Sequence, residues 1–290
     1  MASIIVIGDL AIDIIGYFKN SIKPGANILL KNVKMSTGGV AGNMAWYLIQ
    51  LGQRASVYGS VGNDCWGDLI KNDLRAFGAN QSMVKTANDL ATGFFFILVD
   101  SHGERTMIGN RGASERVNVD SSELISASPS WIHLSGYTLL NSNGINVLNS
   151  VIKAANNLGI NYSIDLEGIG ETDAKLDLRG ATVFCNRGKC SEKSRMNAKL
   201  TVIKSGSDGC YLDLNGMVKQ HKPPLVKPIN TTGAGDSFNA AFITACLMNY
   251  DYDNACDFAN AVAAYKVVQN DTRVKLPKEL LKCYLNHTQF

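Results

Sequence analysis

Short apolar runs, separated by longer amphipathic segments, recur along most of the chain. The first, Ile4 to Ile7, ends at Gly8-Asp9 and is typical of a parallel strand buried on both faces. Similar runs predict strands at 55–60, 131–134, 162–165, 182–185 and 200–203, with helices at 43–51, 66–77, 144–158 and 237–248. This alternation predicts an α/β fold with a doubly wound sheet, whose ligands bind beyond the carboxyl ends of the strands. The residues expected at those ends are Asp9, Asp13, Ser135, Gly136, Asp165 and Asn186.

Two stretches, residues 12–37 and 92–110, interrupt the alternation. Each is predicted to form a pair of antiparallel strands, and the second contains three consecutive phenylalanines, Phe94 to Phe96. Because both follow strand ends, we expect them to join in one small sheet that projects from the main sheet as a lid. A lid would exclude water from a reaction, whereas an ordinary edge hairpin that covers the core is the alternative.

Length and composition favour a single domain that binds a small molecule. No linker, repeat or low-complexity segment interrupts the 290 residues, so we predict one domain over 1–290 with the lid at about 12–37 and 92–110. The net charge of +3, with both signs mixed, does not favour nucleic acid as a partner. Seven scattered cysteines match neither a disulfide framework nor a metal-binding spacing. With no apolar run of about 18 residues and no signal segment, we expect no membrane partner and a cytoplasmic location.

The segment from Asn230 to Asp236 carries the clearest chemical signal. Its sequence, Asn-Thr-Thr-Gly-Ala-Gly-Asp, leads into the helix predicted at 237–248. The N–H groups of Gly233, Ala234 and Gly235 can crowd one point, where the helix N-terminus adds about half a positive charge, so the segment predicts an anion hole for a phosphate. Asp236, in the first turn, could accept a proton from a substrate hydroxyl beside that phosphate. Together they indicate phosphoryl transfer, and a tight loop with an N-terminal aspartate is the plainer interpretation.

A second glycine-rich element, Gly38-Gly39-Val40-Ala41-Gly42-Asn43, begins the first predicted helix. In order and spacing, these two elements resemble the two signatures of the ribokinase-like (PfkB-type) carbohydrate kinases. Further landmarks extend the resemblance to nearly the whole chain: Thr92-Gly93, Gly103-Glu104, Gly112-Ala113, Asn186, Ser205-Gly206 with Gly209, and Asn260-Ala261. The resemblance implies a Rossmann-like α/β domain with a β lid. It also implies transfer of the γ-phosphate of ATP, with Mg²⁺, to a hydroxymethyl group.

The resemblance also implies a role for each matching residue. Asp236 would be the catalytic base, and Gly233, Ala234 and Gly235 would form the anion hole for the transferred phosphoryl group. Asp13 resembles the carboxylate that grips a vicinal diol of the acceptor, with Gly38, Gly39 and Asn43 in the same pocket. The nucleotide side would comprise Asn186, Lys204, Ser205, Gly206, Gly209 and Asn260. Because dimerisation through the lid is common in the family, we also expect a homodimer here.

Three positions depart from the family pattern. Members often carry Asn-x-x-Glu near Mg²⁺ and the phosphates, but Lys189 stands where that glutamate would be, so the metal ligands stay unassigned. Glu192 could substitute for it, or Lys189 could neutralise phosphate directly. Lys204 would add positive charge near the phosphates, yet a lysine cannot bridge β and γ oxygens as Mg²⁺ does, so we predict Mg²⁺ dependence. Asn230 replaces the aspartate that helps to hold K⁺ in K⁺-activated members, which predicts weak or absent K⁺ activation.

The start of the chain bears on the acceptor. Ala11 stands two residues before Asp13, where ribokinases usually have an asparagine that binds the anomeric end of a free sugar. An apolar residue there would tolerate a base on C1 of ribose, and the segment resembles the archaeal nucleoside kinases of the family. We therefore expect a nucleoside acceptor, with Tyr17 and the phenylalanines at 94–96 as candidates for stacking on its base. The alternatives are a ribose, fructose-type or 2-keto-3-deoxygluconate acceptor, or a regulator that binds sugar or nucleoside without turnover.

Overall fold

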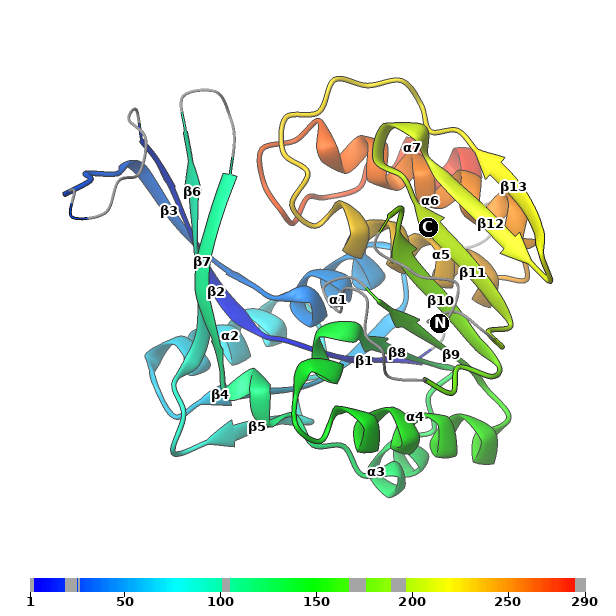
Figure 1. Cartoon of the computed structure of the whole chain (residues 1–290), viewed down its shortest axis with the longest axis horizontal. Coiled ribbons are helices and arrows are strands. Elements are labelled where there is room, and N and C mark those ends of the chain that lie inside the picture. Colours follow the sequence, from blue (N-terminus) through cyan, green and yellow to red (C-terminus); the bar gives the residue numbers. More distant parts are fainter. Residues whose placement is uncertain are drawn as a thin grey trace.

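The computed structural model describes residues 3–18, 25, 27–100, 105–166, 176–188 and 197–284, and these form two sheets with flanking helices (Figure 1). Within these residues the main sheet has nine strands in the order β13-β12-β11-β10-β9-β8-β1-β4-β5. The strands are β1 (Ser3–Ile7), β4 (Arg54–Gly62), β5 (Val84–Ala87), β8 (Trp131–Ser135), β9 (Asn161–Asp165), β10 (Ala181–Asn186), β11 (Leu200–Lys204), β12 (Cys210–Leu214) and β13 (Met217–His221). The strands from β5 to β11 are parallel, and β12 and β13 add an antiparallel edge. All six strands predicted for this sheet are confirmed.

Helices cover both faces of this sheet. The described helices are α1 (Val40–Gln50), α2 (Cys65–Ala76), α3 (Ser121–Ala127), α4 (Gly144–Leu158), α5 (Ala234–Leu247), α6 (Tyr252–Val267) and α7 (Lys278–Tyr284). One buried cluster joins α1, α2, α5, α6 and α7 to the sheet, and a second joins α3 and α4 to the other face. The four predicted helices are confirmed, and α3, α6 and α7 were not predicted. None of the described helices combines the length and apolar character needed to cross a membrane.

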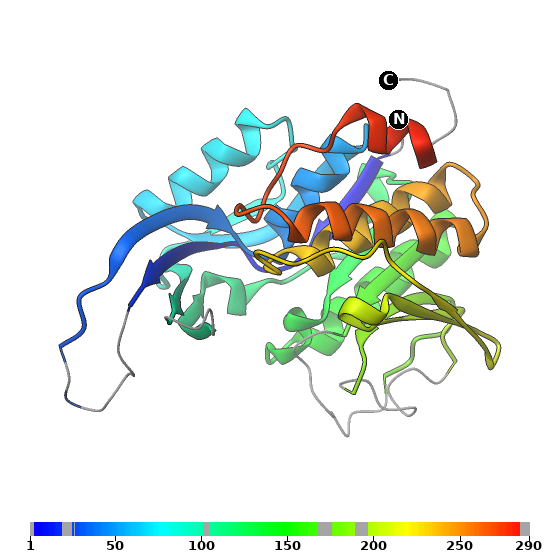
Figure 2. The same ribbon diagram turned by 90° about the horizontal axis from the view of Figure 1, so that it is seen from above.

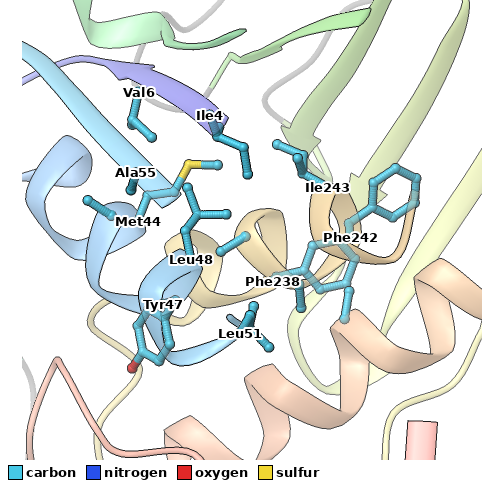
Figure 3. Close-up of a cluster of buried hydrophobic side chains, with 14 of the residues drawn as sticks. Ile4, Val6, Met44, Tyr47, Leu48, Leu51, Ala55, Phe238, Phe242 and Ile243 are labelled. Carbon is cyan, nitrogen blue, oxygen red and sulfur yellow. The ribbon is translucent and has the colours of Figure 1, made fainter. Parts of the chain in front are cut away.

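Packing between α1 and α5 is central to the position of the site. Figure 3 shows Met44 and Leu48 of α1 in one buried cluster with Phe238 and Phe242 of α5 and with Ile4 of β1. All five side chains are almost inaccessible to solvent. Burying each side chain of this size stabilises the fold by about 1.5–3 kcal/mol, so the two helices are firmly fixed against each other. Their N-terminal turns carry the two glycine-rich elements.

The second sheet stands apart from the main one (Figures 1 and 2). Its described strands, β2 (Ala11–Tyr17), β3 (Lys31–Gly38), β6 (Thr92–Val99) and β7 (Arg105–Gly112), run in the order β3-β2-β6-β7. The pairs β2/β3 and β6/β7 are antiparallel, and β2 lies parallel to β6. This confirms the small separate sheet predicted from the two interrupting stretches. Gly103 and Glu104 of the predicted landmarks lie outside the described residues.

Candidate active site

The order of the main sheet indicates where a ligand would bind. From β1 the chain continues to β4 on one side and later to β8 on the other, so the strand order reverses between β1 and β8. In open α/β sheets this reversal leaves a crevice at the carboxyl ends of the strands. Ser135 and Asp165, which end β8 and β9, line one cavity together with Asp236 of α5 and Tyr137. The predicted edge of the sheet and the predicted base are therefore brought together.

The predicted anion hole lies at the N-terminus of α5. Gly233 caps the helix with φ 78° and ψ 4°, a left-handed conformation that glycine adopts without strain. A β-carbon at this position would also lie 2.8 Å from Cγ2 of Thr272. The Ala234 N–H is donated to the Thr231 carbonyl at 3.2 Å and closes the turn. The anion hole would therefore depend chiefly on the N–H groups of Gly233 and Gly235.

Asp236 lies in the first turn of α5 and is bonded to α1. The Asn43 Nδ2 donates to its Oδ2 at 3.1 Å. Asn43 itself lies in the first turn of α1, which follows Gly39. The packing of α1 on α5 therefore brings the two glycine-rich elements, separated by 193 residues, into direct contact.

Asp13 lies in β2 of the small sheet, beside Gly38 of β3. A β-carbon on Gly38 would collide with the Asp13 carboxylate, so this close approach requires glycine. Asp13 is only 7% exposed. This burial raises its pKa to about 6, although the positive charge of Arg273 opposes the rise. The same guanidinium interacts electrostatically with Asp236, so both carboxylates lie near one positive charge.

A neutral histidine lines the same cavity. Burial lowers the pKa of His133 to about 4, and its Nδ1 lies 2.8 Å from Oγ of Ser163. At neutral pH the ring is therefore uncharged, and it is a much weaker base than its ordinary value suggests. It lines the cavity and is a poor candidate for proton transfer.

Four of the residues predicted for the nucleotide side lie at the ends of β10 and β11. Asn186 and Lys204 are neighbours in register, and Ser205 and Gly206 follow in the turn to β12. The sequence did not predict the partner of Lys204: its Nζ lies 2.6 Å from Oδ2 of Asp165, and both side chains are 10% exposed. Burial alone would raise the pKa of Asp165, but this ammonium and a hydrogen bond from Asn239 outweigh it and keep the pKa low. The charge of Lys204 is thus balanced locally. Lys189 and Glu192 lie outside the described residues.

Gly209 and Asn260 both lie against the carbonyl of His221, at the end of the edge strand β13. The Asn260 side chain is 3% exposed and donates its amide to the His221 carbonyl at 2.9 Å. A β-carbon on Gly209 would collide with that same carbonyl oxygen. Both residues therefore have structural contacts, and their predicted contact with nucleotide stays a prediction.

Two arginines at the site were not found from the sequence. Arg111 of β7 donates Nε and Nη2 to the Asp9 carboxylate at 2.6 and 2.8 Å, and Nη1 to Oδ1 of Asn141 at 2.9 Å. Arg273 follows α6 in a segment without regular structure and contacts Asn43. The landmark Gly112-Ala113 next to Arg111 could have drawn attention to it. The sequence around Arg273 has no periodicity that could have done so.

The fold places the chain in the ribokinase-like class. The ribokinase of Arabidopsis thaliana, whose structure was solved with ribose and ATP, matches 99% of both chains with a TM-score of 0.83 and 23% identity. The sequence then gives the family: the model for pfkB family carbohydrate kinases matches residues 1–181 and 189–279, and the chain belongs to this family. It is therefore a phosphotransferase whose acceptor group is a hydroxyl.

Two relatives show how far the resemblance extends. The ATP-dependent ribose-1-phosphate kinase of Halopiger xanaduensis is 27% identical over 268 residues, which cover 89% of both chains. The ribokinase of Haemophilus influenzae is 28% identical over 272 residues, which cover 88% of this chain and 89% of that protein. The two names specify different acceptors. The acceptor of this protein is therefore inferred from its own residues.

Proposed function

We propose that the protein transfers the γ-phosphate of ATP to the 5′-hydroxyl of a nucleoside, with Asp236 as the base. The observation that carries this assignment is the place of Asp236, on the first turn of α5 beside the anion-hole glycines and bonded to Asn43. The acceptor hydroxyl loses its proton to the Asp236 carboxylate as its oxygen attacks the γ-phosphorus. The bond from that phosphorus to the β–γ bridging oxygen breaks, and ADP leaves. A general base of this kind contributes about 10²–10⁴ in rate.

The small sheet supports a nucleoside acceptor through the side chains on one of its faces. Asp13 and Phe95 are neighbours in register on β2 and β6, so their side chains share a face. A β-carbon on Gly109 of β7 would collide with the Phe95 ring, which places Gly109 on that face too. Phe94 and Phe96 point the other way, where Phe94 packs on Trp66. We infer that Phe95 stacks on the base while Asp13 binds the ribose diol.

Mg²⁺ is proposed to enter with ATP. Among the described residues no cluster of three histidine, cysteine or acidic side chains could hold a metal ion. This fits Mg²⁺, which keeps several waters and binds substrate phosphates with only one or two protein ligands. The amide oxygen of Asn186, at the carboxyl end of β10, is the candidate protein ligand. When bound, the ion would offset the negative charge of the β- and γ-phosphates.

Weak or absent K⁺ activation is supported by a lysine beneath the anion-hole loop. Lys266 of α6 has no exposed surface, and its Nζ donates to the Asn230 backbone carbonyl at 2.6 Å. The Asn230 side chain is engaged within the same region, since its Oδ1 accepts the Thr232 N–H at 2.9 Å and its Nδ2 donates to the Asn270 carbonyl at 2.7 Å. A cation carried by the chain itself therefore already contacts this loop.

The small sheet is proposed to act as the lid and as a contact between two copies of the chain. Exposed apolar side chains on its strands, Val33, Met35 and Ile108, would be covered by a second copy. The chain's mass in solution at different concentrations, by light scattering, tests this contact. A monomer at all concentrations would refute the dimer.

The proposed function is tested with a panel of acceptors. The protein is incubated with ATP, Mg²⁺ and nucleosides, ribose, ribose 1-phosphate, fructose or 2-keto-3-deoxygluconate, and ADP is measured. We expect the highest kcat/KM with a nucleoside. The Asp236→Asn variant should still bind the acceptor and lose turnover by about 10²–10⁴. Comparable turnover in Asp236→Asn would refute the base. Saturable binding without ADP from any acceptor would favour the non-catalytic regulator.

A further inference from the structure

The segment that follows α6 returns to the site and is fixed there by α1. The Tyr47 hydroxyl donates to the Thr272 carbonyl at 2.7 Å, and the Trp46 Nε1 donates to the Val274 carbonyl at 2.9 Å. In Figure 3 the Tyr47 hydroxyl points away from the buried cluster, consistent with this bond. The carbonyls on both sides of residue 273 are therefore held by consecutive residues of α1. Arg273 thus projects from a backbone with a fixed position.

The Arg273 side chain is itself held from several directions. It is 12% exposed, and its Nη1 lies 2.6 Å from Oδ2 of Asp73 on α2. The same nitrogen donates to Oγ1 of Thr37 on β3 at 3.1 Å, and the guanidinium lies over the Phe77 ring. A β-carbon on Gly42 would lie 2.5 Å from Nη2. Gly42, the third glycine of the Gly-Gly-Val-Ala-Gly-Asn element, therefore makes room for this arginine.

Arg273 and Asp236 bind opposite ends of the Asn43 side-chain amide. The Arg273 Nε donates to Oδ1 of Asn43 at 3.1 Å, while the Asn43 Nδ2 donates to Asp236 at 3.1 Å. An arginine can only donate hydrogen bonds, so the amide oxygen must face Arg273. The amide nitrogen then has to face the carboxylate. The Asp236 carboxylate only accepts hydrogen bonds and favours the same amide orientation, so the contribution of Arg273 is to hold the amide in place, and without the guanidinium Asn43 could move away from Asp236.

We propose that Arg273 is a positioning residue for phosphoryl transfer, which acts through Asn43 to hold the Asp236 carboxylate in its reactive orientation. This inference rests on the proposed role of Asp236 as the base. The hydrogen-bonded chain runs from Asp73 through Arg273 and Asn43 to Asp236, so it links α2, the C-terminal segment, α1 and α5. Positional errors near 1 Å at a reacting group can cost about 10²-fold in rate, so the orientation of this carboxylate matters greatly.

A purely structural role would have a different signature. If Arg273 only neutralised Asp73 and fixed the C-terminal segment, its loss would lower the stability of the fold without a selective effect on the chemical step. A positioning role predicts a selective loss in kcat. It also predicts that the loss disappears when Asn43 is absent, because Arg273 then has nothing to orient.

The experiment compares Arg273→Met, Arg273→Lys and the control Arg75→Met, which replaces an exposed arginine of α2. With the best acceptor of the panel, we expect Arg273→Met to lower kcat by about 10²-fold while the KM for ATP changes little. Arg273→Lys should recover part of the loss, because an ammonium can donate to Asn43 but cannot also span to Asp73 as the guanidinium fork does. Arg75→Met should behave as wild type.

Two double variants separate a positioning role of Arg273 from a loss of stability. Asp73→Asn combined with Arg273→Met also removes the partly exposed carboxylate that Arg273→Met would leave without its guanidinium partner, so the kinetics are separated from the cost of an unpaired charge. Arg273→Met combined with Asn43→Ala should be no slower than Asn43→Ala alone. The proposal is overturned if kcat in the Asp73→Asn/Arg273→Met protein is close to that of wild type, or if the Arg273 and Asn43 effects multiply. Turnover retained by Asp236→Asn would instead refute the proposed base.

Discussion

Replacing Asp13 with asparagine should make the protein more stable and the acceptor bind worse. Asp13 is 7% exposed, and burial raises its pKa from 3.8 to about 6. At about 1.4 kcal/mol per pH unit, this difference means that the ionised carboxylate destabilises the folded state by about 3 kcal/mol relative to the protonated form. Asparagine keeps the shape and removes the charge. The variant should therefore gain up to about 3 kcal/mol in unfolding free energy at neutral pH.

The sign of the pH dependence follows from the raised pKa. The stability that this group contributes is fully present below pH 3.8 and is lost as the pH rises through about 6. Urea unfolding of Asp13→Asn and wild type from pH 4 to 8 should thus show equal stability near pH 4 and a growing advantage for the variant above it. In wild type the acceptor KM should rise as the pH falls below about 6, since the protonated carboxyl loses one of its acceptor oxygens.

A control separates this effect from the general cost of substitution. Asp68→Asn changes an exposed aspartate in the first turn of α2 and should lower stability by no more than about 1 kcal/mol, the contribution of a carboxylate at a helix N-terminus. The reasoning about burial would be refuted if Asp13→Asn were less stable than wild type at pH 7.5 by an amount that does not vary with pH. An acceptor KM that stays constant from pH 5 to 7 would refute the proposed contact between Asp13 and the acceptor.

Two other substitutions test the acceptor and the loop beneath the anion hole. Phe95→Ala should raise the KM for a nucleoside by about 5- to 150-fold, as expected for 1–3 kcal/mol of stacking, and leave the KM for free ribose nearly unchanged. Phe96→Ala, on the opposite face of β6, should have little effect, and equal losses for nucleoside and ribose in Phe95→Ala would contradict stacking. Lys266→Met should lower kcat by about tenfold or more, because a charge-assisted bond to the Asn230 carbonyl is lost. Exchange of Na⁺ for K⁺ at constant ionic strength should leave wild-type turnover nearly unchanged, and a large rise would contradict the role given to Lys266.

The strands of the main sheet could be predicted because burial on both faces leaves a continuous apolar run. Ile4 to Ile7 is such a run, and β1 occupies residues 3–7. In contrast, α6 was missed because it is buried on several sides, between α5 and the antiparallel edge of the sheet, and so has no narrow apolar stripe. The short α3 and α7 offer too few turns for periodicity to be detected.

For the site, too, local features could be predicted from the sequence and contacts between distant residues could not. The turn at Gly233 and the first turn of α5, which carries Asp236, are local features, and their backbone geometry follows from a few consecutive residues. The bond between Arg273 and Asn43 joins residues 230 positions apart, and the pair of Arg111 with Asp9 spans 102 positions. Such contacts depend on how the helices and the small sheet pack. A single sequence was therefore enough to propose Asp236 as the base and to single out Asn43, but not to find Arg273.

The cations near the site bear on how the charge of ATP is balanced. Lys204 was expected to place positive charge near the phosphates, yet it lies 2.6 Å from the Asp165 carboxylate. Arg111 lies equally close to Asp9, and Arg273 to Asp73. Each of these three cations already has a carboxylate against it, and Asp13 and Asp236 add negative charge, whereas Lys266 contacts the anion-hole loop through the Asn230 carbonyl. One lysine balances little of the charge of a polyphosphate, so we expect Mg²⁺ to arrive with ATP and Mg²⁺ dependence to persist although Lys189 replaces the usual glutamate.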